Sequence, residues 1–377
     1  MNESKDVLSF IKNSGRFSQS FKEQRSLTSL YEQKGVLLDR KILAIFDCEE
    51  NYAYRLMDFI GTRDKIPFEI HVFTRADSFF SFAKETEIEC LLISENAYQS
   101  KIEQLNIAHI IVLSENGENL NRALCHINKY QSCENVVREV MHYYADKTES
   151  GRMIRTGSHR MRIIGIYTPA TRCLQTTFSF TLGQMLARQS KTLYLNFEAY
   201  SGLGRMLSRE FSRDLSDLIY YLNSARDKLF YHMEGMIETV NGLDFIPPAE
   251  IYQNLAGIRG AQWIDLFEEI EKTSEYEYLL LDLSDCVMDL WEILKHCDRV
   301  YTITRNDSIA TAKIEQYEKV LESMQQQSVL TKTRKWELPL FKKLPLRFEE
   351  LTYGDLAGYI RKEVFPDLFG EEGYGTK

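Results

Sequence analysis

The sequence predicts an α/β protein with two doubly wound, parallel-sheet domains. Two stretches of the chain each contain short apolar runs that alternate with helix-like segments, a pattern typical of parallel sheets covered by helices. The length of 377 residues is sufficient for two domains. Between the stretches, residues 148–160 are rich in glycine, serine and arginine, which indicates a linker. We therefore expect domains at 40–147 and 161–377, preceded by a helical extension at 1–39.

The composition narrows the class of protein. Hydrophobic residues make up 44% and charged residues 27% of the chain, and the net charge of -9 argues against nucleic acid as a partner. The seven cysteines form no C-x-x-C pair, which favours reduced thiols in the cytoplasm and disfavours a zinc site. No apolar stretch approaches the roughly 20 residues of a membrane span, and the N-terminus lacks a signal-peptide core. We expect a cytoplasmic protein with no metal site and no direct membrane insertion.

The first domain is predicted to contain four apolar strands, with the sequences KILAIFD, FEIHVF, ECLLIS and HIIVLS. Helices are expected at 54–60, at 78–83 and from about residue 134 onwards. Parallel sheets carry their chemistry at the carboxyl ends of the strands, and the sequence places polar residues there. These residues are Asp47, Ser94, Ser114 and, before the last helix, Lys129.

This layout resembles the receiver domain of response regulators. That family places acids after its first strand, a phospho-accepting aspartate after the third, a hydroxyl residue after the fourth and a lysine after the fifth. By position, Asp47 matches an acid, Ser114 the hydroxyl and Lys129 the lysine. Ser94 stands where the phospho-acceptor belongs, and a serine with no base beside it cannot form an acyl phosphate. Glu95 is adjacent, but we expect it to point elsewhere because successive strand residues face opposite sides.

The resemblance therefore implies a pseudo-receiver with a flavodoxin-like strand order, which serves as a recognition module and is not switched by phosphate. One alternative is that the acids at 47, 49 and 50 hold a metal. The other is that the same polar residues are strand ends that simply face solvent.

The second domain opens on a strand, a loop and a helix. An apolar run at 163–167 predicts a buried strand, a polar loop follows at 168–175, and apolar residues then recur at helical spacing. In this setting, nucleotide-binding proteins hold phosphate on backbone N–H groups at a helix N-terminus.

Further alternation completes the second predicted sheet. Strands are expected at 192–197 and in GLDFIPP, EYLLLDLSD and DRVYTITR, with a late strand-like piece in KLPLRF. Helices are expected at 214–222, about 229–240, 261–272 and 308–324, followed by a C-terminal helix. Asp307 and Ser308 are predicted to cap the helix at 308–324.

This second layout resembles the MinD/ParA class of ATPases. Joined to a receiver-like domain, it resembles the TadZ/CpaE family of Flp (Tad) pilus assembly proteins over about residues 40–365. The MinD/ParA phosphate loop has the form K-G-G-x-G-K followed by two hydroxyl residues. In this chain the loop begins at Thr168, the first lysine falls at Ala170 and the second at Gln175. The three glycines and the variable position fall at Thr171, Arg172, Leu174 and Cys173.

Several landmarks of that class remain. The two hydroxyls match at Thr176 and Thr177, and the acid after the next strand falls near Asn196 and Glu198. The aspartate at the end of a later buried strand matches at Asp282. Thr176 and Asp282 are residue types that can still hold Mg²⁺. The alternative is that the threonine is a helix cap and the aspartate is a strand end that meets water.

The departures remove the groups that hold phosphate. Glycines are needed because backbone N–H groups must approach phosphate oxygens and some adopt positive φ. Thr171, Arg172 and Leu174 instead put side chains where phosphate would lie. The loop lysine neutralises phosphate charge, and Gln175 carries none. We therefore expect no productive ATP hydrolysis and no cofactor. The alternative is a divergent switch that binds ATP with Mg and uses Arg172 as the replacement charge.

The resemblance implies a dimeric cytoplasmic scaffold that localises or assembles a Tad-type (type IVb) pilus machine. Its partners would be a second copy of the chain, the pilus motor ATPase and inner-membrane pilus components. Dimers of this class pair through the face with the phosphate loops, where Cys173 and Leu174 are expected to make pairing independent of nucleotide. The chain ends FPDLFGEEGYGTK, which lacks the basic face of a membrane-binding helix, so recruitment to the membrane or cell pole would go through partners. A DNA-binding partition factor is a weaker alternative because the chain is acidic.

Overall fold

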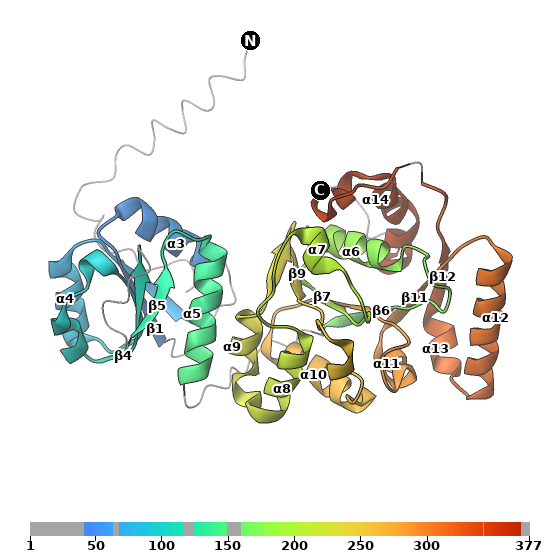
Figure 1. Cartoon of the computed structure of the whole chain (residues 1–377), viewed down its shortest axis with the longest axis horizontal. Coiled ribbons are helices and arrows are strands. Elements are labelled where there is room, and N and C mark those ends of the chain that lie inside the picture. Colours follow the sequence, from blue (N-terminus) through green and yellow to red (C-terminus); the bar gives the residue numbers. More distant parts are fainter. Residues whose placement is uncertain (1–40, 63–67, 116–123, 149–159, 342, 371–377) are drawn as a thin grey trace, which may run out of the picture. The chain divides into compact units, whose positions relative to one another are not determined.

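The computed structural model describes residues 41–62, 68–115, 124–148, 160–341 and 343–370 (Figure 1). The chain forms two compact units, Met1–Lys147 and Thr148–Lys377, and each is described by itself. The helical extension expected at 1–39 lies outside the described residues. The same holds for the expected linker, except for its end residues Thr148 and Arg160.

The first unit contains a five-stranded sheet in the order β2-β1-β3-β4-β5, and all neighbouring strands are parallel. This is the flavodoxin-like order of a doubly wound sheet, so the fold class predicted for this stretch is confirmed. The strands are β1 (Lys41–Phe46), β2 (Phe68–Phe73), β3 (Ile88–Ser94), β4 (Ile107–Ser114) and β5 (Cys125–Asn128). The helices are α3 (Glu50–Thr62), α4 (Ala76–Glu85) and α5 (Cys133–Lys147).

The apolar runs predicted β1 to β4, but not β5. That strand has only four residues, CHIN, at the edge of the sheet, and Ile127 is its single buried residue. Edge strands bury fewer side chains than central strands, which leaves a weak sequence signal. Aromatic residues fill one side of the sheet, where Phe46 stacks on Phe79 with ring centroids 4.8 Å apart.

The second unit contains a seven-stranded sheet in the order β12-β11-β6-β10-β7-β9-β8. All neighbouring strands are parallel except β8 and β9, so the predicted α/β parallel-sheet class is confirmed here as well. The strands are β6 (Arg162–Ile166), β7 (Thr192–Asn196), β8 (Glu238–Val240), β9 (Leu243–Ile246), β10 (Tyr278–Asp282), β11 (Arg299–Thr304) and β12 (Thr333–Glu337).

The helices of the second unit lie on both faces of its sheet, with α6 and α14 on one face and α8, α10 and α11 on the other (Figure 1). They are α6 (Gln175–Leu186), α7 (Leu203–Leu207), α8 (Leu215–Ser224), α9 (Leu229–Glu234), α10 (Gly260–Thr273), α11 (Leu290–His296), α12 (Ser308–Ser323), α13 (Gln327–Lys332), α14 (Asp355–Tyr359) and α15 (Phe365–Phe369). None of the helices in the described parts of the chain has the length and apolar character needed to cross a membrane.

Two expected elements of the second unit differ from the structure. The helix expected at about 229–240 ends at Glu234, and the chain then forms β8, which pairs antiparallel with β9. The strand-like piece expected in KLPLRF is not a strand. The edge strand is instead β12, whose sequence TRKWE is too polar for an apolar-run signal. The predicted cap of α12 is confirmed, because Asp307 Oδ1 accepts hydrogen bonds from the N–H groups of Ile309 (3.1 Å) and Ala310 (2.8 Å).

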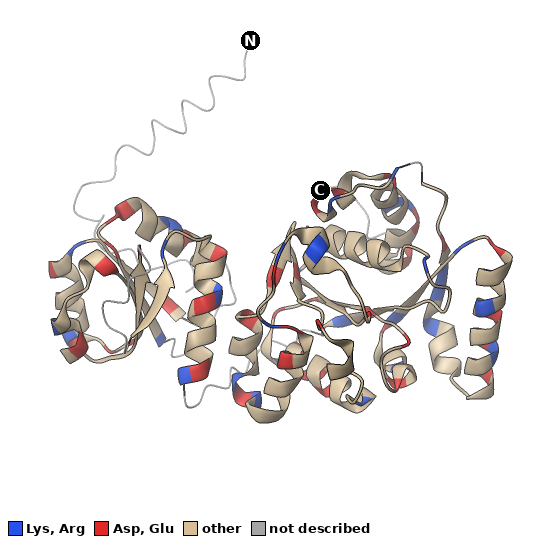
Figure 2. Cartoon of the chain, in the orientation of Figure 1, with Lys and Arg blue, Asp and Glu red and all other residues tan. Residues whose placement is uncertain are grey.

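Helix α6 follows the loop predicted as a phosphate site and is deeply buried. It contains no charged residue (Figure 2), and ten of its twelve residues are buried. Its inner hydroxyls are satisfied within the helix, since Ser179 Oγ donates to Gln175 O (2.8 Å). A Cβ at Gly183 would lie 2.8 Å from Leu243 Cδ2, so glycine lets the helix approach the sheet closely. This packing holds the N-terminus of α6 at the carboxyl edge of the sheet.

Candidate functional sites at the carboxyl edges of the two sheets

The loop between β6 and α6 adopts left-handed backbone conformations without glycine. Arg172 has φ of 61° and Leu174 has φ of 64°, and both positions correspond to glycines of the phosphate-loop motif. Thr171, at the first glycine position of the motif, is not among the positive-φ residues. Each left-handed non-glycine residue costs about 1 kcal/mol. The chain therefore keeps part of the backbone shape of a phosphate loop even though it has lost the residues that make that shape easy.

Local side-chain contacts hold this loop. Thr168 Oγ1 accepts a hydrogen bond from Ala170 N (3.1 Å), and Cys173 Sγ donates to Ala170 O (2.7 Å). Arg305 Nη1 donates to Arg172 O (3.3 Å) from the end of β11. Cys173 is buried, and burial raises the pKa of its thiol. Cys173 therefore cannot contribute to an exposed pairing face, and our expectation for this residue was wrong.

The backbone N–H groups of residues 171–177 donate no hydrogen bond to any group in the described parts of the chain. Such groups normally bind water or an anion at a helix N-terminus. The side chains of Thr171 and Arg172 are exposed beside them. The loop thus retains backbone donors, while its side chains differ from those of a phosphate site.

The position expected for the second motif lysine is occupied by Gln175, which is buried. Its Nε2 donates to Asp282 Oδ1 (2.6 Å) and to Leu283 O (2.9 Å). Asp282 lies between the ends of β6 and β7, in register with Ile166 and Asn196. The sheet topology therefore brings together two residues that are 107 positions apart in the chain.

The second carboxylate oxygen of Asp282 is also occupied. Tyr194 Oη donates to Asp282 Oδ2 (2.8 Å), and Asn196 Nδ2 donates to both Asp282 Oδ2 (3.1 Å) and Tyr194 Oη (2.8 Å). Asn196 Oδ1 in turn accepts from Glu198 N (3.0 Å). Of these residues, Tyr194 was not predicted. Its only sequence signal is a polar ring in an otherwise apolar strand, TLYLN.

Burial has a strong effect on the carboxyl group of Asp282. Burial raises its pKa to about 7, the nearby charge of Glu198 adds to the increase, and the hydrogen bonds from Gln175, Tyr194 and Thr176 oppose it. Burial likewise raises the pKa of Glu198, against a hydrogen bond from Thr176. A carboxyl group with a raised pKa is a poor ligand for a divalent cation, because the cation binds the ionised form. Thr177, the second matching hydroxyl, is half-buried near the helix start.

The residues at this edge do not fit ATP with Mg. The position of the charged lysine holds a neutral amide, and that amide is directed at the aspartate that would bind the metal. Both oxygens of the aspartate already accept protein hydrogen bonds. Phosphate charge would be met by backbone N–H groups and by the exposed guanidinium groups of Arg172 and Arg305. We derive no catalytic step through a nucleotide at this site.

We expect Arg172→Gly to raise the free energy of unfolding of the second unit by about 0.5–1 kcal/mol, because glycine adopts positive φ without a steric penalty. Urea unfolding followed by tryptophan fluorescence measures this, since Trp263, Trp291 and Trp336 all lie in the second unit. Thr171→Gly is the matched control, because Thr171 is also exposed but does not have a positive φ. This variant should lower the free energy of unfolding by about 0.5–1 kcal/mol. Equal losses in both variants would contradict the assignment of strain to Arg172.

In the first unit, a buried lysine lies at the carboxyl edge of the sheet. Lys129 Nζ is 2.8 Å from Asp47 Oδ2, 3.0 Å from Glu49 Oε1 and 3.4 Å from Glu115 Oε1. Burial alone would lower the pKa of Lys129, but the hydrogen bonds and charges of Asp47 and Glu49 raise it above its ordinary value. Tyr52 covers the ammonium group, with its ring centroid 4.8 Å from Nζ. One ammonium group is therefore the shared ion-pair partner of three carboxylates.

The serine positions of this edge have different surroundings. Ser114 Oγ donates to Glu95 Oε2 (3.1 Å), and the same oxygen accepts from Glu115 N (3.1 Å). Glu95 therefore faces the site, and our expectation that it points elsewhere was wrong. The reason is that Glu95 begins a 3-10 turn directly after β3, where strand alternation no longer applies. Ser94 is buried at the end of β3, and its Oγ has no hydrogen-bond partner among the described residues.

The structure thus brings Asp47 and Lys129 into direct contact and adds Glu49, Glu95 and Glu115, which the sequence comparison had not assigned. Glu49 had a signal, since it follows a buried strand two residues after Asp47. Glu115 follows Ser114 at another strand end and had the same kind of signal. The order of strands in the sheet, rather than any motif, determines that these acids surround one lysine.

Comparisons with solved structures found α/β proteins that are similar to part of this chain. The chain is similar to an ATP complex of McdA from Cyanothece (17% identity, 55% of this chain and 81% of that chain covered, TM-score 0.39). It is also similar to a ParA family ATPase from Chlorobium tepidum TLS (17% identity, 44% of this chain and 69% of that chain covered, TM-score 0.38). A third similar structure is MinD with Mg-ADP from Pyrococcus horikoshii OT3 (15% identity, 44% of this chain and 66% of that chain covered, TM-score 0.34). No protein-family model and no curated protein matches the sequence. At these identities and TM-scores, the similarities carry no statement about a substrate, partner or activity of this chain.

Proposed function

We propose that this chain is a non-catalytic localisation or assembly factor for a Tad-type pilus machine and acts as a dimeric scaffold in the cytoplasm. The observation that carries the proposal is the Gln175 amide, which donates to Asp282 and to Leu283 O. A MinD/ParA-type ATPase needs a lysine and a free aspartate at these positions for phosphate and Mg²⁺. Here Gln175 and Asp282 form a hydrogen bond with each other and leave no lysine or free aspartate for a nucleotide. The domain therefore serves as a rigid framework. The TadZ/CpaE resemblance of the sequence supplies the pilus context.

The partner surface proposed for the second copy is the carboxyl edge of the seven-stranded sheet. Exposed apolar side chains follow three strands there: Tyr200 is 84% exposed, Ile309 69% and Met288 38%. Leu174 is half-buried on the same edge, whereas Cys173 is buried. Burying such side chains against a second copy favours association without any nucleotide. This set replaces the pair Cys173 and Leu174 in the sequence-based proposal.

The first unit is proposed as the docking module for the pilus motor ATPase or an inner-membrane component. The Lys129 ammonium group lies within 3.4 Å of oxygens of Asp47, Glu49 and Glu115, so a positive charge of the protein already occupies the place among these acids that a bound cation would take. A serine at position 94 offers no carboxylate for phosphorylation. Docking that does not depend on a phosphorylation state follows from these two features.

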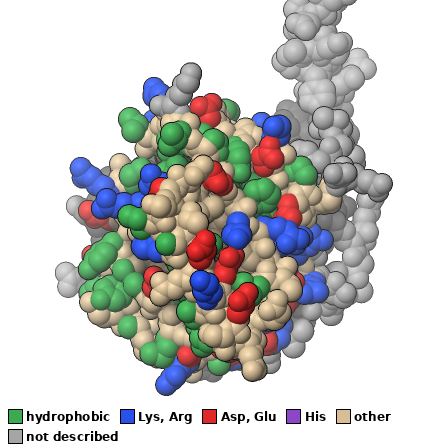
Figure 3. All heavy atoms as spheres, turned by 90° about the vertical axis from the view of Figure 1, so that its right-hand side faces the viewer, with side chains coloured by type: hydrophobic (Ala, Val, Ile, Leu, Met, Phe, Trp, Pro, Cys, Tyr) green, Lys and Arg blue, Asp and Glu red, His purple; other side chains and the backbone are tan. Residues whose placement is uncertain are grey.

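The second candidate is a divergent ATP-binding switch, and two observations favour it. The N–H groups of residues 171–177 have no partner among the described residues, and the loop keeps two left-handed residues. A DNA-binding factor has less support. Figure 3 shows acidic and basic side chains interspersed on the face that carries α12, where for example Glu318 pairs with Lys335 (2.8 Å), instead of a basic stripe.

Calorimetric titration of Mg·ATP into the purified chain separates the two candidates. We expect no saturable heat up to millimolar ATP, and we expect sedimentation to report a dimer at micromolar protein without nucleotide. Asp282→Ala is the test variant, and Asp285→Ala, an exposed acid of the next loop, is the control. Micromolar binding that is lost only in Asp282→Ala would refute the scaffold and support the switch. A monomer at micromolar concentration would also contradict the scaffold.

A further inference from the structure

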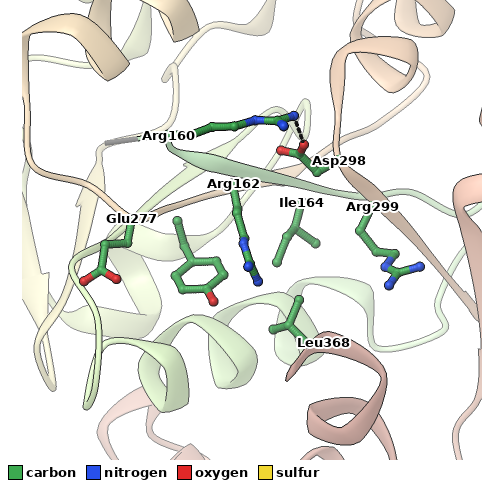
Figure 4. Close-up of a pocket in the computed structure, with 8 residues that line it drawn as sticks. Arg160, Arg162, Ile164, Glu277, Asp298, Arg299 and Leu368 are labelled. Carbon is green, nitrogen blue, oxygen red and sulfur yellow. Dashed lines mark hydrogen bonds and ion pairs between the residues drawn. The ribbon is translucent and has the colours of Figure 1, made fainter. Parts of the chain in front are cut away.

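A cavity of about 540 Å³ lies at the amino-terminal edge of the seven-stranded sheet, away from the phosphate loop (Figure 4). Its lining includes the first residues of β6, β10 and β11, which are Arg162, Tyr278 and Arg299. The five residues of β6 span about 13 Å, so the cavity and the loop are separate places in the unit. Ligand pockets of small molecules have volumes of about 300–1,000 Å³, and this cavity is of that size.

Positive charge is in excess inside the cavity. Arg162 is exposed and forms no ion pair among the described residues. Arg299 Nε lies 3.7 Å from Asp367 Oδ2, but Arg334 Nε shares the same carboxylate at 3.2 Å, so two guanidinium groups share one acid. In Figure 4, Arg162 and Arg299 extend to the same side of the sheet edge.

The acids that line the cavity are already engaged. Asp298 pairs with Arg160 (2.5 Å) and accepts from Ile163 N (2.8 Å), so both of its oxygens are satisfied. Glu277 Oε2 accepts from Ser190 Oγ (3.1 Å). Neither acid forms an ion pair with Arg162 in the described parts of the chain. An incoming anion would therefore meet a guanidinium group that no carboxylate yet neutralises.

The remaining walls of the cavity are apolar. Ile164 extends from β6 and Leu368 from α15 toward the same space (Figure 4), and the ring of Tyr278 forms part of the lining. Charged groups at one side and apolar groups at the other are typical of sites that bind an amphipathic small molecule. Guanidinium groups match phosphate and carboxylate groups through paired, charge-assisted hydrogen bonds.

We propose that this cavity binds a small organic anion. Its phosphate or carboxylate group lies against the guanidinium groups of Arg162 and Arg299, and an apolar or aromatic body packs on Ile164, Tyr278 and Leu368. The site is independent of the proposed scaffold function and of the phosphate loop, because it uses none of the residues at the opposite edge of the sheet. It provides the second unit with a place for a small-molecule signal that does not require the nucleotide site.

Phenyl phosphate is a suitable probe because it combines one phosphate with one ring. Calorimetry or saturation-transfer NMR on the full chain should show saturable binding, with weaker binding of inorganic phosphate and of benzyl alcohol. Arg162→Gln should weaken the binding of phenyl phosphate by about tenfold or more, because charge-assisted hydrogen bonds to the phosphate are lost. Arg347→Gln is the matched control, because Arg347 is an exposed arginine outside the cavity lining that pairs with Glu349, and the change should alter affinity by less than about twofold. Unchanged melting of both variants would show that they fold.

Three outcomes would overturn this proposal. The first is no saturable binding of phenyl phosphate to the full chain. The second is equal weakening in the Arg162→Gln and Arg347→Gln variants. The third is loss of binding in Arg172→Gln but not in Arg162→Gln, which would place the probe at the phosphate loop. None of these results bears on whether Mg·ATP binds through Asp282.

Discussion

Lys129→Met should lower the free energy of unfolding of the first unit by about 3–5 kcal/mol. The lysine is buried among three carboxylates, and Asp47 is as deeply buried as the lysine itself. Removal of one partner of a buried ion pair leaves an uncompensated charge, here the buried carboxylate of Asp47, and this is among the most destabilising changes known for single residues. Mutual repulsion of Asp47, Glu49 and Glu115 adds to the loss.

Two spectroscopic signals make this measurement specific. Tryptophan fluorescence follows the second unit alone, because the first unit has no tryptophan, whereas far-UV circular dichroism follows both. In Lys129→Met the dichroism transition should move to lower urea while the fluorescence transition stays unchanged. The additional change Asp47→Asn should recover part of the loss, because it removes the buried negative charge.

Lys41→Met provides the control within the same unit. Lys41 Nζ lies 2.6 Å from Glu89 Oε1, but the lysine side chain is about half exposed, and exposed pairs contribute at most about 1 kcal/mol. If Lys129→Met lowers the free energy of unfolding by no more than Lys41→Met does, then the cluster is solvated in solution and Lys129 does not take the place of a bound cation.

The second large effect is a loss of stability of the second unit as the pH rises from about 4 to about 7. The folded-state pKa of Asp282 is raised from 3.8 to about 7, so the folded chain keeps a proton that the unfolded chain releases in this interval. Unfolding then releases a proton, and higher pH favours the unfolded state. The stabilisation is complete below pH 4 and is lost as the pH approaches 7, by an amount on the order of 3 kcal/mol.

The contribution of Asp282 is obtained from the difference between the wild-type chain and Asp282→Asn at each pH, measured by tryptophan fluorescence in urea. The difference should shift in favour of the variant as the pH rises. Asp265→Asn is the control of opposite sign: Arg226 lowers the pKa of Asp265, so its stabilising contribution is present at neutral pH and is lost in acid. An Asp282 difference that does not vary with pH would mean that the carboxylate stays ionised, as a cation ligand would.

Much of the fold follows from local sequence. The apolar runs of β1 to β4 and of β6, β7, β10 and β11 predict buried parallel strands, and the alternation with helices predicts doubly wound sheets. The Asp307 cap of α12 was also predictable, because a cap needs only one short polar side chain before an apolar periodic segment. The edge strands β5, β8 and β12 were not predicted, since partly exposed strands carry polar residues and lack a periodic signal.

The sequence by itself determined which groups a nucleotide site would lack, because the absence of the glycines and of the lysine can be seen in the order of residues alone. Only the tertiary structure decided what takes their place. Gln175 reaches Asp282, and Lys129 reaches Asp47, because neighbouring parallel strands end side by side at one edge of each sheet. These partners lie 107 and 82 positions apart in the chain, and no local pattern connects them. The free energy of a buried polar group depends on what surrounds it, and strand order determines those surroundings.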